Sequence, residues 1–154
     1  MLALIRGAGD IASGIALRLR RCGFRVAMTE INRPTTIRRT VAFSNAVLRG
    51  TQTVEDLTAV RADTPEAVLA ALEAGLIPVL VDPSCVCLSW LKPDLLVDAI
   101  LAKRNLGTAI TDAPVVIGVG PGFTAGLDCH AAVETMRGHT LGRVIYQEIG
   151  RAHV

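Results

Sequence analysis

The stretch LALIRGAGDIASGIALRLRRCGFRVAMTE, residues 2–30, decides the fold. It begins with a short apolar run (2–6) typical of a buried strand, and a glycine-rich turn (7–10) follows. Apolar residues then recur with the period of a helix (10–22), and a glycine ends that pattern. A second apolar run (24–29) comes next. This order predicts two parallel neighbouring strands joined by a helix in a right-handed crossover.

The turn and the helix start match the dinucleotide-binding fingerprint, here Gly7-x-Gly9-x-x-Ala12. The first glycine permits the turn, the second lets the backbone approach a pyrophosphate, and the small third residue lets helix and strand pack closely. Glu30 follows about 20 residues on, where an acid hydrogen-bonds a ribose. The alternative is a tight glycine turn that binds nothing. The residues predicted to bind the cofactor here are Gly7, Gly9, Asp10, Ala12, Ser13 and Glu30.

The rest of the chain alternates strand and helix patterns, which predicts a Rossmann-like α/β fold with a mostly parallel sheet. Thr64-Pro65-Glu66 is a strong helix start, combining a cap, a proline in the first turn and an early acid. We further expect a short helix at 35–39, a β-hairpin insertion within 41–62, a helix to residue 74, strands at 76–81, 95–101 and 115–119, and a C-terminal hairpin of 129–135 with 141–146.

A second glycine-rich loop follows the predicted strand 115–119 and contributes Gly118, Gly120 and Gly122 as candidate cofactor-binding residues. Successive glycines can form a nest of backbone donors for an anion. The loop lacks the Lys-Ser/Thr of a P-loop, which excludes a nucleoside triphosphatase of that type. Ligands bind beyond the carboxyl ends of the strands in an open parallel sheet, and this loop leaves from that edge. The alternative is a turn in which space is restricted.

Polar residues in two further stretches form a second candidate site. Asp98 lies inside an apolar run and needs a partner, for which Lys103 is the nearest candidate, and an ion pair that only stabilises the fold is the alternative. On an alternating strand, His130 and Glu134 lie on the same face. One interpretation is proton transfer or metal ligation, and the alternative is a hydrogen-bond network that only stabilises the fold. We expect the structural network and no metal. The polar candidates are Asp98, Lys103, Asn105, Asp128, His130, Glu134 and His139.

Composition limits the class of protein. The chain has 154 residues, 51% of them hydrophobic, a net charge of +2 and no apolar run long enough to cross a membrane. No basic run indicates nucleic acid, and no export signal is visible, so we expect a cytoplasmic protein with reduced thiols. Cys85-x-Cys87 lacks the spacing of a zinc knuckle. The apolar excess also suits a surface that meets a missing domain or, in a homo-oligomer, a partner subunit.

The last seven residues, EIGRAHV (148–154), back-translate to a string that resembles the start of a common sequencing adapter. The next codon of that adapter in this frame is a stop. We therefore expect one domain over residues 1–147 that continues in the native protein, and a non-native tail over 148–154. Such a tail is expected to pack against nothing, and Leu141, Val144 and Tyr146 are expected to be left partly uncovered.

Four runs carry a more specific signal. They are RGAGDIASGIALRL (6–19), EINRPTTIRRTVAF (30–43), VDAILAKRNLGT (97–108) and GVGPGFTAGLDCHAAVETMRGHTLGRVIY (118–146). Together they resemble the YqeB family, whose members are described as accessory proteins of selenium-dependent molybdenum hydroxylase systems, distantly similar to XdhC-type maturation factors. The resemblance spans residue 1 to about residue 147. It implies a longer protein and assigns no catalytic residue.

Three functions remain open at this point. The resemblance implies a maturation factor that binds a nucleotide or a molybdopterin dinucleotide and has a molybdenum hydroxylase as its client. The fingerprint also suits an NAD-dependent oxidoreductase, in which Glu30 would repel a 2′-phosphate while the nearby Arg33 weakens that preference. In the third alternative the chain is a non-catalytic docking scaffold, and its glycine loops serve only the fold. Catalytic residues, and a role for Cys85 or Cys87, are not assigned by the sequence.

Overall fold

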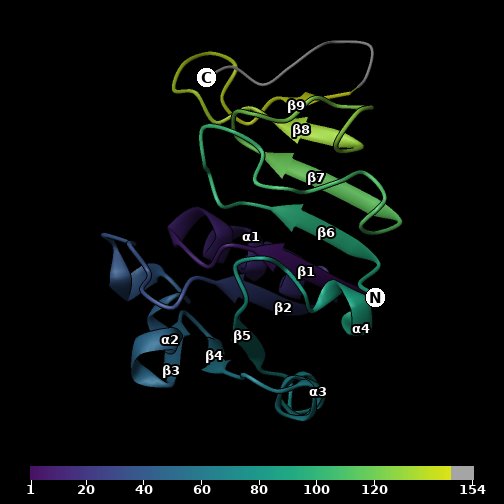
Figure 1. The fold of residues 1–154 in the computed structure, drawn as a ribbon. Coiled ribbons are helices and arrows are strands. Elements are labelled where there is room, and N and C mark those ends of the chain that lie inside the picture. Colours follow the sequence, from purple (N-terminus) through teal and green to yellow (C-terminus); the bar gives the residue numbers. More distant parts are fainter. Residues whose placement is uncertain (147–154) are drawn as a thin grey trace.

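The computed structural model describes residues 1–146 and has one nine-stranded sheet, in the order β3-β4-β5-β2-β1-β6-β7-β8-β9. Figure 1 shows the strands stacked from β9 at one end to β3 at the other. The elements are β1 Leu2–Arg6, α1 Asp10–Arg21, β2 Arg25–Glu30, a 3-10 turn η1 Arg39–Val41, α2 Asn45–Arg49, β3 Thr51–Val54, β4 Leu57–Arg61, α3 Pro65–Glu73, β5 Ile77–Val81, α4 Leu88–Leu91, β6 Leu95–Asp98, β7 Val115–Val119, β8 Ala131–Val133 and β9 Val144–Ile145.

The predicted strand–helix–strand unit is confirmed. β1 and β2 are parallel neighbours with Leu2 opposite Arg25 and Arg6 opposite Thr29, and α1 connects them. β1 also pairs in parallel with β6 on its other side, so the chain reverses its direction of progress across the sheet at β1. The fold is therefore α/β and Rossmann-like, and the boundary between β1 and β6 is where such sheets open a crevice for ligands.

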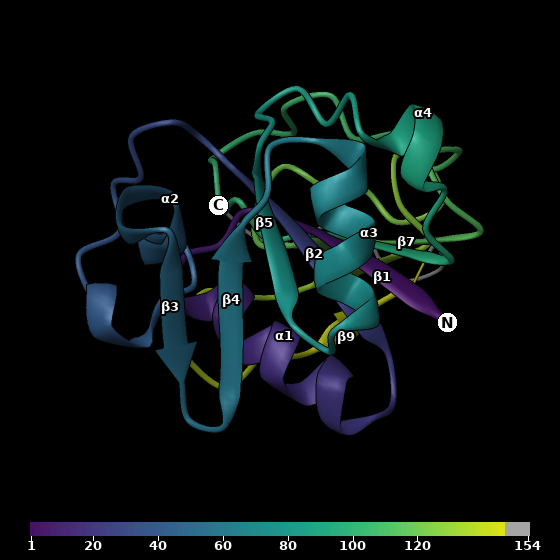
Figure 2. The same ribbon diagram turned by 90° about the horizontal axis from the view of Figure 1, so that it is seen from below.

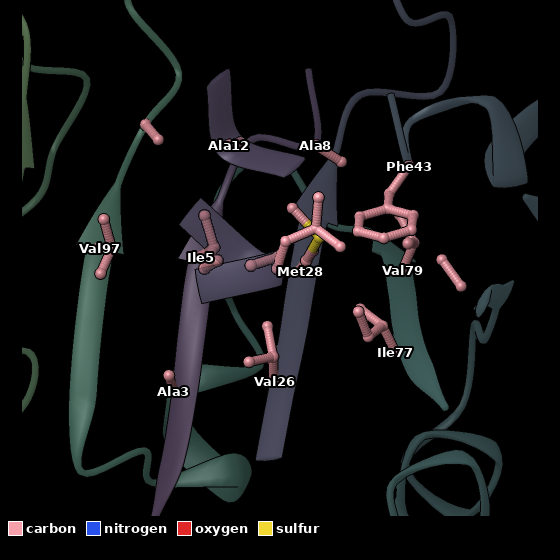
Figure 3. Packing of buried hydrophobic residues seen from close by; sticks show 14 of the residues in the cluster. Ala3, Ile5, Ala8, Ala12, Val26, Met28, Phe43, Ile77, Val79 and Val97 are labelled. Atoms are coloured by element: carbon pink, nitrogen blue, oxygen red, sulfur yellow. The ribbon is translucent and has the colours of Figure 1, made fainter. Parts of the chain in front are cut away.

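Two apolar layers cover the two faces of the sheet. One face carries alternate residues such as Ile5 and Met28, and it packs against α1, α2 and Phe43. Figure 3 shows these side chains of β1, β2, β5 and β6 on one side of the sheet. The opposite face carries Leu4 and Leu96 and packs against α3 and α4. Figure 2 shows α3 lying along β5 on this second side.

Several predicted elements need correction. The short helix expected at 35–39 is wrong, because residues 35–38 are irregular and the 3-10 turn η1 begins only at Arg39. The strand expected at 95–101 ends at Asp98, where the chain leaves the sheet to wrap the cavity described below. α4 was not predicted, since its four residues are too few to show a helical period.

The two hairpins are confirmed with shorter strands than expected. β3 and β4 pair antiparallel. The insertion also contains the helix α2, which precedes these two strands. β8 and β9 pair antiparallel as the C-terminal hairpin. Leu141, Val144 and Tyr146 are exposed by 59%, 44% and 59%, as predicted. The expectations for the tail at 148–154 lie outside the described residues.

No helix within residues 1–146 combines the length and apolar character that a membrane span requires.

Candidate functional site

A cavity of about 620 Å³ lies at the carboxyl ends of β1, β2 and β6, where the sheet reverses its order. Its volume falls in the range of small-molecule sites, roughly 300–1,000 Å³. The glycine turn, the end of β2 and the loops after β2, β5 and β6 all contribute to its wall. The lining residues are Gly7, Gly9, Asp10, Ile11, Ala12, Thr29, Glu30, Ile31, Thr35, Thr36, Ile37, Arg38, Pro83, Ala99, Ile100, Leu101 and Leu106.

The two glycines of the fingerprint differ in what requires them. Gly7 has φ +94°, and a Cβ there would lie 3.0 Å from the carbonyl oxygen of Ala99, so the fold itself demands glycine. Gly9 has φ −66°, which any residue adopts, and a Cβ there would meet only Thr36 Oγ1, at 3.6 Å. Neither conformation nor protein packing therefore requires Gly9. Its missing side chain leaves room in the cavity wall at the start of α1.

The start of α1 provides backbone donors next to that room. Gly9 is the N-cap, and the first helical hydrogen bond runs from the N–H of Ser13 to the carbonyl of Gly9 at 2.8 Å. The N–H groups of Asp10, Ile11 and Ala12 precede that bond and have no backbone acceptor within the helix. The carboxylate of Asp10 accepts from Ile11 N–H. Ala12 lines the cavity as expected, and its small side chain is buried against the sheet.

Ser13 does not line the cavity. Its hydroxyl is fully buried, donates to the carbonyl of Ala8 and accepts from the N–H of Phe43 at 2.8 Å. Ser13 thus joins the glycine turn to the segment that leads into α2. This contact gives Ser13 a role in holding the turn in place.

Glu30 reaches the cavity from the end of β2, as the fingerprint predicts. One carboxylate oxygen accepts from the N–H of Ala8 at 3.0 Å, and the other accepts from the N–H of Ile31 at 2.7 Å. Each of these oxygens keeps further lone-pair capacity. Glu30 therefore ties the glycine turn to β2 and presents an acceptor to the cavity at the same time.

The mouth of the cavity carries an ion pair that the sequence did not predict. Arg38, in the loop after β2, contacts the carboxylate of Asp10 at the start of α1. The side chain of Arg38 is 73% exposed and that of Asp10 is 27% exposed. An acid at a helix N-terminus competes with a bound anion for the same positive end of the helix. Arg38 neutralises that acid and places a guanidinium beside the start of α1.

Asp98 pairs with Arg6, and the expectation that Lys103 is its partner is wrong. Arg6 Nη1 lies 3.4 Å from Asp98 Oδ2, and both side chains are almost fully buried. The hydroxyl of Thr108 donates to the same oxygen at 2.6 Å. Arg6 also donates to the carbonyls of Pro83 and Leu106, at 3.1 and 3.4 Å.

This network contacts two residues of the cavity lining. Pro83 and Leu106 both line the cavity, and Arg6 immediately precedes the glycine turn. Arg6 therefore fixes the loops after β5 and β6 relative to the turn. Sequence reasoning missed Arg6, although the parallel pairing of strands 2–6 and 95–98 brings their last residues side by side.

Lys103 and Asn105 take different positions in the loop after β6. Lys103 is exposed. The side-chain oxygen of Asn105 accepts from the N–H groups of Gly107 and Thr108, and its amide donates to the carbonyl of Thr108 at 2.7 Å. Asn105 shapes the turn that delivers Thr108 to Asp98. Neither Lys103 nor Asn105 lines the cavity.

The second glycine loop does not reach the cavity, and packing accounts for its glycines. A Cβ on Gly118 would lie 2.6 Å from Phe123 Cδ1, and one on Gly120 would lie 2.9 Å from Leu101 Cδ2. A Cβ on Gly122 would lie 2.6 Å from the Cα of Arg104. These contacts match the alternative of a turn in which space is restricted. An anion-binding role for the loop stays a prediction.

The polar residues between 128 and 139 do not assemble around one point. Asp128 accepts from the N–H of Thr124, and exposed His130 accepts from the N–H of Val116 through Nδ1. Glu134 is buried and accepts from the N–H of Met136, whereas His139 is exposed. Because β8 covers only Ala131–Val133, His130 and Glu134 flank the strand in different surroundings.

The cysteine pair lies in the loop after β5, next to the cavity residue Pro83. Cys85 and Cys87 are both buried and free. A hydrogen bond between the two thiols lowers the pKa of Cys85, and the charge of Arg6 lowers it further, while burial acts in the opposite direction. The same hydrogen bond raises the pKa of Cys87. The carboxylate of Asp82 accepts from the N–H of Cys87 at 2.8 Å. The pair belongs to the second apolar layer.

Comparison with known proteins found one informative relative. The chain is 59% identical over 145 residues to the "Uncharacterized protein YqeB" of Escherichia coli (strain K12). The match covers 94% of this chain and 27% of that relative. No family model and no solved structure matches the chain.

The name of the relative states no activity, and the chain spans about a quarter of the relative's length. The match extends over nearly all of the chain. Over the matched residues, this similarity supports assignment of the chain to the YqeB family.

Proposed function

We propose that this chain is the nucleotide-binding unit of an accessory factor that matures a molybdenum hydroxylase, a selenium-dependent one on the family resemblance. The ligand class is a nucleotide or dinucleotide, such as NAD or a molybdopterin dinucleotide. The observation that carries the proposal is Gly9. The protein has no conformational or packing need for glycine there, and a side chain would project into the cavity at the helix N-terminus.

The residues around the cavity fit the groups of such a ligand. The N–H groups at the start of α1 and the guanidinium of Arg38 suit the phosphates. The carboxylate of Glu30 suits a ribose hydroxyl. Aliphatic side chains, among them Ile31 and Leu101, suit the flat faces of a base or a pterin.

The lining favours binding over catalysis in this unit. Its charged members are Asp10, Glu30 and Arg38, and each has a role in holding the turn or an anion. Among residues 1–146, no histidine, lysine, cysteine or tyrosine lines the cavity to act as a general acid, base or nucleophile. An oxidoreductase would need such groups from other parts of a longer polypeptide.

Calorimetric titration of the chain with NAD, ADP and a molybdopterin dinucleotide tests the proposal. We expect saturable binding of at least one of them, with one site per chain. Inorganic pyrophosphate is the informative control ligand, because it offers phosphates without a ribose or a base. Absence of binding to all three nucleotides, with the chain shown to be folded by circular dichroism, would refute the proposed function.

A further inference from the structure

Three strands at one end of the sheet are fully covered on one face and only partly covered on the other. β7, β8 and β9 follow β6 in the sheet, and register partners on neighbouring strands point to the same side. Leu96, Val116, Ala132 and Ile145 form one row on the side of the second apolar layer. All four are buried, with exposures between 0% and 5%.

The opposite face is only partly covered: Val119 and Ala131, which lie on it, are 4% and 7% exposed, and Ile117 and Val133 pack partly against the first apolar layer. We define the bare face by Val115, Ile117, Val133 and Val144, which alternation and register place together on the other side of the same strands. Val115 is 45% exposed and Val144 44% exposed, while Ile117 and Val133 are half-buried. Exposed apolar residues continue next to β9, at Leu141 and Tyr146.

The missing element is a helical layer. Parallel strands with apolar residues on both faces normally carry helices on both. α1 supplies this cover over β1 and β2, but in Figure 1 every helix lies beside β1 to β6 or at the β3 end, and none lies beside β7 to β9. Within the described part of the chain, the connections from β6 to β7 and from β7 to β8 contain no helix.

We propose that a helix from the remainder of the family polypeptide packs on the bare face. The E. coli relative carries about three quarters of its length outside the match, which is ample chain to supply this element. The expected partner segment is amphipathic and aliphatic, because the bare face consists of valine and isoleucine and offers no charge. Exposed apolar residues on a sheet face of this kind mark an intramolecular or intermolecular interface.

Cysteine labelling tests this in two contexts. Val115→Cys and Val144→Cys are made in a Cys22→Ser background, because Cys22 is the exposed cysteine of the described chain. Each is labelled with a maleimide in this chain and in a full-length chimera, in which residues 1–146 replace the matching part of the E. coli relative. Leu69→Cys on α3, 51% exposed and far from the bare face, is the matched control.

We expect both bare-face positions to react at least about tenfold more slowly in the chimera, and the control to react at a similar rate in both proteins. Equal rates at Val115 and Val144 in the two contexts would overturn the proposal. If the two cysteines already react slowly in this chain, and more slowly as the protein concentration rises, a second copy of the chain covers the bare face. That result would also overturn the proposal.

A second measurement avoids dependence on the chimera. The remainder of the E. coli relative is co-expressed with this chain, and the complex is isolated through a tag on that remainder. Val144→Lys should abolish co-purification, because a charge would have to be buried in the apolar contact, whereas Leu69→Lys should leave it intact. Co-purification that survives Val144→Lys, or that Leu69→Lys abolishes equally, would contradict the assigned face.

Discussion

Arg6 and Asp98 are register partners at the carboxyl ends of the adjacent parallel strands β1 and β6, and their side chains form a buried ion pair of 3.4 Å. Arg6 immediately precedes the glycine turn. Through two carbonyl contacts, Arg6 also holds Pro83 and Leu106, which line the cavity. The geometry of the site thus depends on one guanidinium at the point where the sheet reverses its order.

Replacing Arg6 by methionine should destabilise the chain by about 3–5 kcal/mol, because Asp98 would remain buried without its counter-ion. Urea unfolding followed by circular dichroism measures the change. Arg21→Met is the matched control, since Arg21 forms an exposed pair with Glu55. That control should cost less than about 1 kcal/mol. Equal losses for the two variants would show that the Arg6 network does not support the fold.

Glu30→Ala should weaken a ribose-bearing ligand by about 1–3 kcal/mol, the cost of losing a charged hydrogen bond. Glu30 also holds Ala8 N–H, so the variant is compared on two ligands by calorimetry. ADP should lose affinity, while inorganic pyrophosphate should bind as in the unmodified chain. The same loss for both ligands would mean that Glu30 acts only by holding the turn.

Asp10→Asn and Arg38→Ala should have opposite effects on ligand affinity. The first removes a negative charge from the anion position, and the second leaves that charge uncompensated. We expect roughly tenfold stronger binding for Asp10→Asn and roughly tenfold weaker binding for Arg38→Ala, each about 1.4 kcal/mol. Both effects should shrink as salt increases. Stability should change by less than about 1 kcal/mol, because Arg38 is 73% exposed and solvent screens the pair.

Cys129 should make stability fall at high pH. Burial first, and the charge of Asp128 second, raise the pKa of the Cys129 thiol from 9.0 to about 11. Between those values the unfolded chain loses the proton while the folded chain keeps it, so the stabilisation present below pH 9 is lost as pH rises toward 11. The loss should reach roughly 2 kcal/mol. Urea midpoints measured from pH 8 to 11 should show a shallower decline in Cys129→Ala; parallel declines would contradict this assignment.

The fold was predictable where local patterns are strong. Residues 2–30 combine an apolar strand, a helical period and a glycine turn, and the structure reproduces all three within a residue or two. The end of β6 was not predictable, because Ala99 to Leu101 are as apolar as the strand itself. Only the tertiary structure shows that these residues leave the sheet to line the cavity.

The site was predictable in part for a related reason. Gly9 and Glu30 belong to a motif with fixed spacing, and both line the cavity. Arg6 and Arg38 act across the chain, with partners 92 and 28 residues away in sequence, so only strand pairing and loop packing show what they contact. The glycines at 118, 120 and 122 look like an anion site in sequence, yet neighbouring side chains and backbone fill the space beside them.

The central claim is that Gly9 is glycine because a ligand occupies the space beside it. Calorimetric titration of the Gly9→Val variant with the nucleotide that binds the unmodified chain tests this most directly. Gly14→Ala is the control, since Gly14 lies in α1, is exposed and has no atom within 4 Å of an added Cβ. We predict that Gly9→Val folds with unchanged circular dichroism and loses binding by at least about a hundredfold, about 2.7 kcal/mol, whereas Gly14→Ala binds normally. A folded Gly9→Val variant with unchanged affinity would contradict the account.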